Sequence, residues 1–296
     1  MKKLYIILLL FLITVNNSFA GKIIDDLGKE IELKNNNPKV VALSWEVMEM
    51  VISLGIKPVG VSDVSNYKKW VALSHMPNGV IDMGPRNQLN LEKISSVKPD
   101  IIIIGSSQTK YIDKLEKIAP VMFVEIFKDN ENPFKNMENN LIKIGKLFDK
   151  QQNAEKIMQQ TYKLIKQKGK LVKDKNSPVA FVRFLRNGKR FRLHGEKSMA
   201  GSVINLMGLQ NVYKGKTNHW GFALMNAEKL RNLSRNLQFI YIKDDWGGYN
   251  SMTKNPLWKT FHFVRNKNIY STPDVWAYGG PLSAQKIATY ISDALK

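Results

Sequence analysis

The side chains best suited to binding a ligand in this chain are aromatic and cationic residues in segments without helical or strand periodicity. Three of the six tryptophans, Trp70, Trp220 and Trp276, lie in such segments, and Tyr278 follows closely in "VWAYGG". Arg86 lies in a similar segment, "MGPRNQLN". Aromatic rings form the apolar walls of ligand sites, and a guanidinium offers a permanently charged fork of donors to oxygen atoms. Any one tryptophan could equally be a core residue, but their coincidence in loops favours contact with a ligand.

A further tryptophan, Trp246 in "DDWGGYN", would lie at the rim of this pocket or belong to a turn with surface aromatics. The four histidines are widely spaced and cysteine is absent, so we expect no metal ion bound directly by the protein. Neither the G-x-S-x-G nor the H-E-x-x-H motif of hydrolases occurs. We therefore expect a binding protein and not an enzyme, with a secreted hydrolase as a remote alternative.

One short phrase occurs twice along the chain. "NLEKI" at 90–94 precedes a buried strand-like run, and "NAEKL" at 226–230 precedes another. Each phrase places a glutamate, Glu92 or Glu228, in the first turn of an expected helix, where the helix dipole stabilises a carboxylate. The dipole explains one glutamate but does not explain why both halves place one at the equivalent position. We expect two acidic surface residues, one in each lobe, on the same side of the molecule.

The segments around these residues alternate between strand-like and helix-like patterns, and the second half repeats the order of the first. Such alternation is typical of a parallel sheet covered on both faces by helices. The sequence thus predicts an α/β protein with two Rossmann-like lobes and mostly parallel central sheets. The expected strands are 38–43, 57–63, 100–105, 120–125, 177–184, 238–242 and 268–271, and the clearest helices are 45–55 and 198–208.

A long amphipathic segment between the two halves predicts a stiff connection. A helix over roughly residues 150–173 would be about 36 Å long, and Asp149 with Gln152 resembles a capping box that starts it. A rigid connector permits small rocking motions and disfavours wide closure. We expect an N-terminal lobe at 21–149, one connecting helix at 150–173, a C-terminal lobe at 174–296, and a ligand cleft between the lobes.

Residues 1–20 have the pattern of a secretory signal peptide. Lys2 and Lys3 precede an apolar run too short to span a membrane as a permanent helix, and Ser18 and Ala20 form a small-residue cleavage site. Cleavage after Ala20 would lower the formal net charge from +20 to +18. Because the chain lacks cysteine, we expect neither disulfides nor a lipid anchor. We expect a soluble periplasmic protein whose scattered lysines solvate the surface or attract an anionic solute, and which does not bind nucleic acid.

The order of motifs over nearly the whole chain resembles that of solute-binding proteins of ABC importers whose lobes are joined by a single long helix. That group serves ferric siderophores, haem and cobalamin, and the resemblance is strongest to periplasmic ferric-hydroxamate-binding proteins. No single motif is decisive, and the resemblance rests on the collinear order of the motifs. The matching segments include "GPRNQLNLEKISSVKPD", "TNHWGFALMNAEKL" and "NPLWKTFHFVRNKNIYSTPDVWAYGGPLSA".

The resemblance implies that the ligand is a ferric siderophore, foremost a ferric hydroxamate. An anionic ferric catecholate or carboxylate chelate, haem and cobalamin are the alternatives. In that family the arginine matching Arg86 hydrogen-bonds the hydroxamate oxygens, and the matches of three aromatic residues line the same pocket. The chain departs from the pattern where the family has a pocket tyrosine, since Ser107 or Gln108 stands there with Tyr111 nearby. The expected ligand-binding residues are Trp70, Arg86, Gln108, Tyr111, Trp220, Trp246, Trp276 and Tyr278.

The resemblance also implies a protein partner. In that family, paired acidic residues that match Glu92 and Glu228 dock onto arginines of an inner-membrane permease, which an ATPase drives. Two acidic residues at a fixed separation can be recognised together. We expect a monomer that carries the siderophore as its ligand and has no cofactor.

Overall fold

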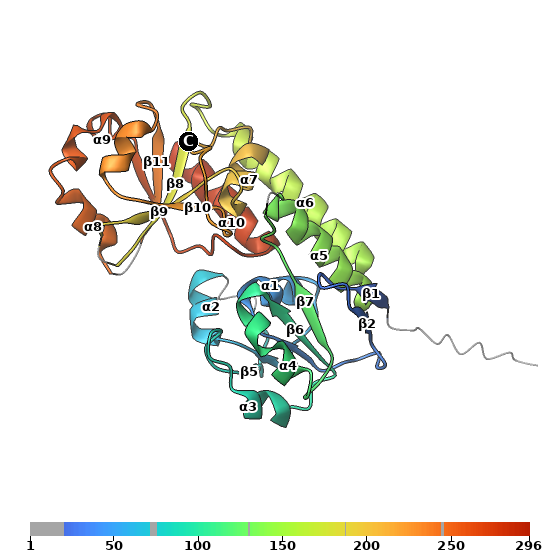
Figure 1. Cartoon of the computed structure of the whole chain (residues 1–296). Helices are drawn as coiled ribbons and strands as arrows, with labels where there is room; N and C mark the ends of the chain where they lie inside the picture. The colour runs from blue at the N-terminus through green and yellow to red at the C-terminus, as the bar shows by residue number, and fades with distance from the viewer. Residues whose placement is uncertain (1–20, 72–75, 130, 187, 244–245) are drawn as a thin grey trace, which may run out of the picture.

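The structure is a computed structural model in which two α/β lobes lie side by side, with a pair of long helices along one flank (Figure 1). The predicted α/β class and two-lobed architecture are confirmed. The expected signal peptide lies outside the described residues. No helix within the part of the chain that the structure describes has the length and apolar character needed to cross a membrane. The structure describes residues 21–71, 76–129, 131–186, 188–243 and 246–296.

The sheet of the N-terminal lobe is parallel throughout its described strands. Their order is β5-β4-β3-β6-β7, and Val40 of β3 pairs in register with Ile101 of β6. Because helices cover both faces, β3, β6 and β7 are buried at every position, as their unbroken apolar runs predict. The strands are β3 (Val40–Ala42), β4 (Gly60–Val61), β5 (Ile81–Asp82), β6 (Ile101–Gly105) and β7 (Val121–Val124), and a small antiparallel sheet of β1 (Lys22–Ile24) and β2 (Glu30–Glu32) precedes them.

The sheet of the C-terminal lobe is mixed. Strands β8, β11 and β12 are parallel, whereas β9 runs antiparallel to β8, and β10 runs antiparallel to β9. The sequence pattern predicts the three parallel strands but not β9 and β10. The order is β10-β9-β8-β11-β12, and the strands are β8 (Val179–Phe184), β9 (Phe191–His194), β10 (Phe222–Met225), β11 (Gln238–Ile242) and β12 (Ile269–Thr272).

The repeated phrase occupies equivalent places in the two lobes. It precedes β6 in the first lobe and β11 in the second, and each of these strands lies next to the lobe's first central strand. In both copies the asparagine side chain caps the turn: Asn90 Oδ1 accepts from the Lys93 N–H at 2.9 Å, and Asn226 Oδ1 accepts from the Lys229 N–H at 3.3 Å. The second copy forms a 3₁₀ helix and not the expected α-helix.

The helices pack around a core that is continuous between the lobes. The largest apolar cluster includes Met48, Met137, Met158, Val203 and Ile287, which come from five helices of both lobes and their connection. The helices of the N-terminal lobe are α1 (Trp45–Ser53), α2 (Val64–Trp70), α3 (Leu91–Ser96), η2 (Ser106–Tyr111) and α4 (Ile112–Leu115). Those of the C-terminal lobe are α7 (Met199–Leu206), η3 (Glu228–Asn232), α8 (Gly248–Thr253), η4 (Trp258–Thr260), α9 (His262–Arg265) and α10 (Pro281–Leu295).

Two antiparallel helices, and not one, connect the lobes (Figure 1). Helix α6 (Gln151–Lys170) is the expected connector and is roughly 30 Å long. Helix α5 (Pro133–Leu147) packs along it and contacts α1 and β1 of the first lobe as well as α7 of the second. The expected capping box is wrong, because Asp149 has a positive φ of 54° and α6 begins without a side-chain cap. The paired helices make the connection stiffer than a single helix would be.

A buried carboxylate on one lobe accepts hydrogen bonds from the other lobe. Glu49 on α1 is fully buried, and its Oε1 accepts from the Ser283 N–H at 2.7 Å while its Oε2 accepts from the Ser283 hydroxyl at 2.6 Å. Ser283 lies in the first turn of α10, in the other lobe. Gly279 permits this approach, because a Cβ there would lie 2.5 Å from Glu49 Oε2. Burial raises the pKa of Glu49, and the donors of Ser283 and Gly280 and the charge of Lys286 act in the opposite direction.

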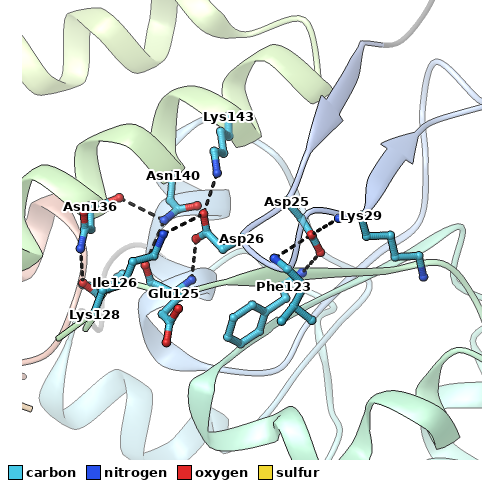
Figure 2. Close-up of polar contacts among 11 residues, drawn as sticks. Asp25, Asp26, Lys29, Phe123, Glu125, Ile126, Lys128, Asn136, Asn140 and Lys143 are labelled. Atoms are coloured by element: carbon cyan, nitrogen blue, oxygen red, sulfur yellow. Dashed lines mark hydrogen bonds and ion pairs between the residues drawn. The ribbon is translucent and has the colours of Figure 1, made fainter. Parts of the chain in front are cut away.

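Where the chain leaves the N-terminal lobe, two aspartates and two asparagines hold it in place (Figure 2). Asp25 accepts from the Phe123 N–H at 3.0 Å, and Asp26 accepts from the Glu125 N–H at 2.8 Å, so the β1–β2 turn is bound to the end of β7. From α5, Asn140 Nδ2 donates to the Glu125 carbonyl at 3.3 Å, and Asn136 Nδ2 donates to the next carbonyl, that of Ile126, at 3.1 Å. These contacts fix the segment that crosses to the second lobe.

Asp26 is expected to make stability depend on acidity. Its side chain is only 3% exposed, and Lys143 Nζ lies 2.6 Å from Oδ1. Although burial raises the pKa of Asp26, the hydrogen bonds from Lys143, Glu125 and Asn140 outweigh it and lower the pKa. A lowered folded-state pKa gives stability that is present above the unfolded pKa of about 4 and is lost as the pH falls through the folded pKa. Asp26→Asn should therefore cost about 1–3 kcal/mol at pH 7 and less at pH 3.

The measurement is urea unfolding of the wild type and Asp26→Asn at pH 7, 4 and 3. Asp129→Asn, which changes a carboxylate outside any helix whose side chain is 88% exposed, is the matched control and should leave the free energy of unfolding unchanged at each pH. An equal loss of stability for Asp26→Asn at pH 7 and pH 3 would show that its charge contributes nothing.

Candidate functional site

A cavity of about 210 Å³ lies between the lobes and is lined by both. Its walls contain four aromatic residues, two arginines, one glutamate and one serine. Four of the residues expected to bind ligand, Arg86, Trp220, Trp276 and Tyr278, meet here although they are far apart in the sequence. The lining consists of Glu46, Arg86, Ser107, Arg192, Trp220, Phe222, Trp276 and Tyr278.

Arg86 is held by stacking more than by hydrogen bonds. Its guanidinium carbon lies 3.5 Å from the ring centroid of Trp45 and 4.9 Å from that of Trp276, which are cation–π distances. Asp63 Oδ2 forms an ion pair with Nε at 3.5 Å, but Nε is buried and has no well-formed hydrogen bond to any described residue. Burial lowers the pKa of Arg86, and the charges of Glu46 and Asp63 oppose that change. The arginine thus has an orientation fixed by aromatic rings and donors still available to an acceptor.

Gln108 and Tyr111 support the Arg86 loop and lie outside the cavity lining. Gln108 is fully buried, and its Nε2 donates to the Arg86 carbonyl at 3.0 Å while its Oε1 accepts from the Gly105 N–H at 3.2 Å. The Tyr111 hydroxyl donates to the Asn87 carbonyl at 3.0 Å. Their polar groups are therefore used to hold the backbone, whereas the neighbouring Ser107 lines the cavity.

Glu46 places a carboxyl group beside Arg86. It lies on the first turn of α1, and Gly105 at the end of β6 makes room for it, because a Cβ there would lie 2.4 Å from Glu46 Oε1. Burial raises the pKa of Glu46. Its own backbone N–H, the charge of Arg86 and the Ser44 hydroxyl act in the opposite direction, but the effect of burial is larger. A sequence pattern gives little warning of this residue, since a glutamate in a first turn is usually exposed.

The aromatic wall is a connected cluster centred on Tyr278. Its ring centroid lies 5.0 Å from Trp276, 5.7 Å from Trp220 and 6.2 Å from Phe222. Phe127, in the segment that crosses between the lobes, lies 5.0 Å from Trp220 and joins the cluster from behind. Mutual packing of these rings fixes their orientation before any ligand arrives.

Arg192 is a cavity residue that the sequence interpretation missed. It lies on β9, and its Nη1 donates to the Tyr278 hydroxyl at 3.1 Å. Phe191 and Leu193 on either side are buried, so a short alternation of apolar and polar residues between two glycines was the signal available. At the end of the same strand, burial and the charges of Arg192 and Arg183 lower the pKa of His194 to about 3, which keeps that imidazole neutral.

Trp70 and Trp246 form a second aromatic contact between the lobes. Their ring centroids are 6.3 Å apart, and the guanidinium of Arg183 lies 4.2 Å from the Trp70 centroid and 5.5 Å from that of Trp246. The backbone N–H of Trp276 also donates to the backbone carbonyl of Trp70 at 3.1 Å. The structure thus brings these two predicted residues together next to the cavity segment, but neither lines the cavity itself.

Glu92 and Glu228 are exposed, each at the start of a short helix and away from the cavity lining. Glu228 borders a separate surface hollow of about 750 Å³ on the second lobe, together with Lys189, Arg190 and Lys254. Their role in docking stays a prediction.

A cavity between two lobes, walled by aromatic rings and reached by one arginine from each lobe, defines a two-lobed solute-binding protein. The chain belongs to the periplasmic binding protein family, whose sequence model matches residues 40–275. Within the described residues, no group of three or more acidic, histidine or cysteine side chains is placed to hold a metal ion.

The chain is similar to several characterised proteins along most of its length. The iron(3+)-hydroxamate-binding protein FhuD of Escherichia coli (strain K12) is 28% identical over 257 residues, which cover 87% of this chain and 86% of that protein. The Fe(3+)-citrate-binding protein YfmC of Bacillus subtilis (strain 168) is 28% identical over 270 residues, covering 88% and 84%. The siderophore-binding protein FhuD of Vibrio cholerae, solved with Fe3+-Desferal, superposes with a TM-score of 0.81 at 28% identity and covers 88% of this chain and 98% of that one.

Proposed function

We propose that this protein captures a ferric siderophore and delivers it to an ABC importer. The observation that carries the proposal is the Arg86 guanidinium at a cavity between the lobes. It is stacked on Trp45 and lies close to Trp276, and its buried Nε has no well-formed hydrogen bond to any described residue. A ferric chelate presents oxygen atoms around the metal and apolar linkers outside them. Guanidinium donors and aromatic walls complement those two parts.

The relatives support ferric chelates as the ligand class without selecting one chemistry. Two of them share the same identity with this chain, yet one is named for iron(3+)-hydroxamate and the other for Fe(3+)-citrate. The solved relative with bound Fe3+-Desferal supports a ferric hydroxamate as one of the candidate ligands. The iron would arrive already chelated, and the protein would bind the complex without transforming it.

The test of this function is a tryptophan-fluorescence titration with ferric hydroxamate, catecholate and citrate chelates, haem and cobalamin. Trp45, Trp220 and Trp276 lie at or beside the cavity, so their emission should be quenched when it is filled. Saturable binding of at least one ferric chelate is expected. Binding of haem or cobalamin alone, or of none of the compounds, would contradict the proposal.

We further propose that the loaded protein, exported to the periplasm, docks on a permease through Glu92 and Glu228. The support is their equivalent position in the two lobes, each exposed at an asparagine-capped turn before a central strand. Glu92→Ala combined with Glu228→Ala should leave siderophore affinity within about twofold of the wild type. Iron uptake by cells should fall by about tenfold or more, because interfacial charge pairs contribute several kcal/mol when their partners are buried.

Uptake of a radioactive ferric chelate by cells that produce each variant measures this effect. Glu30→Ala with Glu32→Ala, which removes two exposed carboxylates from β2, is the matched control and should leave uptake unchanged. Normal uptake by the Glu92/Glu228 double variant would exclude the docking role.

A further inference from the structure

Arg192 reaches the cavity from the lobe opposite Arg86. On β9 it pairs in register with Arg183 of β8, and Arg183 is stacked against Trp70. Arg192 itself lines the cavity beside Tyr278 and Phe222. The cavity is therefore bounded by a guanidinium on each side, and its lining contains one carboxyl group, that of Glu46.

The two arginines have different surroundings. Arg86 has the carboxylate of Asp63 at 3.5 Å and Glu46 in the same cavity wall. Arg192 donates to the neutral hydroxyl of Tyr278 at 3.1 Å and lies 4.8 Å from the ring centroid of Phe222. Among the described residues no carboxylate lies within ion-pair distance of it. A guanidinium has five N–H donors, so most of those of Arg192 are available to a ligand.

The charge of a ferric chelate depends on the groups that bind the iron. Three hydroxamates carry one negative charge each and neutralise Fe³⁺. When an α-hydroxycarboxylate with both oxygens ionised replaces one hydroxamate, the complex has a net charge of −1, and that charge is shared by the oxygens around the iron. A half-buried guanidinium that has no anionic partner among the described residues gains most from a ligand of this kind, because the attraction between opposite net charges is stronger where water is partly excluded.

We propose that Arg192 is a specificity-determining residue which, together with Arg86, selects an anionic ferric chelate containing a hydroxycarboxylate over an uncharged tris-hydroxamate. The inference rests on the proposed function and specifies the substrate class of the same cavity. Arg86 supplies donors that any iron-bound oxygen can accept, whereas Arg192 supplies the uncompensated positive charge that discriminates between ligands.

Two probes separate these roles. Ferrioxamine E is an uncharged cyclic tris-hydroxamate complex, and ferric schizokinen has two hydroxamates and a citrate hydroxycarboxylate with a net charge of −1. The wild type should bind ferric schizokinen about tenfold more tightly or better in a fluorescence titration. Arg192→Gln should weaken ferric schizokinen binding by about 10- to 100-fold and ferrioxamine E binding by less than about threefold.

Matched variants keep the test decisive. Arg192→Lys retains the charge and should recover part of the preference, and Arg235→Gln, an exposed arginine in the same lobe, should have no effect. Thermal unfolding checks that each variant is folded. If the wild type binds the two chelates within threefold of each other, or if Arg192→Gln weakens both equally, the inference is wrong and the proposed function still stands. If neither these two probes nor any other ferric chelate binds the wild type, the proposed function itself fails.

Discussion

Arg86→Ala is expected to weaken binding of a ferric siderophore by about 2–4 kcal/mol, or roughly 30- to 900-fold. Affinity falls because the charge-assisted hydrogen bonds to the iron-bound oxygens are removed. The cation–π contacts of the guanidinium with Trp45 and Trp276 are removed as well, while the two rings, which touch edge to face with centroids 4.6 Å apart, should keep their own contact. Isothermal or fluorescence titration with the tightest-binding ferric chelate measures the effect. The fold should be preserved, because the side chain is only half buried and its loop is held by Gln108 and Tyr111.

Two further variants separate charge from geometry at this position. Arg86→Lys keeps the positive charge but loses the planar fork and its stacking on Trp45, so its affinity should lie between those of the wild type and Arg86→Ala. Arg235→Ala, which removes an exposed arginine, is the control and should bind normally. An Arg86→Ala protein that keeps its affinity within twofold would remove this residue from the site.

Glu49→Ala is expected to lower the free energy of unfolding by about 3–5 kcal/mol, the largest stability effect that the structure predicts. The substitution leaves the Ser283 N–H and hydroxyl without their acceptor and opens a void between α1 and α10. It also removes a negative charge near the half-buried Lys286. Burial lowers the pKa of Lys286, and the charges of Glu49 and Asp274 oppose that change. Urea unfolding followed by circular dichroism provides the measurement.

Glu49→Gln distinguishes the hydrogen bonds from the charge. Its amide has the same shape, its oxygen can accept from the Ser283 N–H, and its nitrogen can donate to the Ser283 hydroxyl oxygen. Its loss should be about 1–2 kcal/mol, clearly smaller than that of alanine. A loss below about 1 kcal/mol for Glu49→Ala would mean that the lobes are held by apolar packing alone.

Much of the fold could be predicted because its central strands have strong local signals. The runs that became β6, β7, β8 and β11 are mostly apolar and almost fully buried, and helical segments lie near them in the sequence, so pattern alone identifies them. β9 alternates between apolar and polar residues, and β10 is a short apolar run that is mostly not buried. Their antiparallel pairing depends on contacts that local sequence does not encode. The partnership of α5 with α6 was missed for the same reason, since a helical pattern shows which face is apolar but not what covers it.

The site could be predicted only in part. Arg86, Trp220, Trp276 and Tyr278 were identifiable because they stand in loops where periodicity ends, and the structure brings them to one cavity. Gln108 shows the limit of this reasoning, because residue type does not reveal that its amide is used by the backbone. Arg192 and Glu46 lie inside regular elements, where a charged residue ordinarily faces water. Their burial at the cavity follows from the placement of one lobe against the other.

The Glu49–Ser283 contact and the shared core also bear on how a transporter would distinguish the ligand-bound protein from the ligand-free protein. With α1 fastened to α10 and two helices along the flank, we expect the distance between Glu92 and Glu228 to be set by the scaffold and to change little when a ligand binds. On that expectation, a transporter would recognise the ligand-bound protein at the mouth of the cavity, from the exposed edge of the chelate and the side chains that contact it.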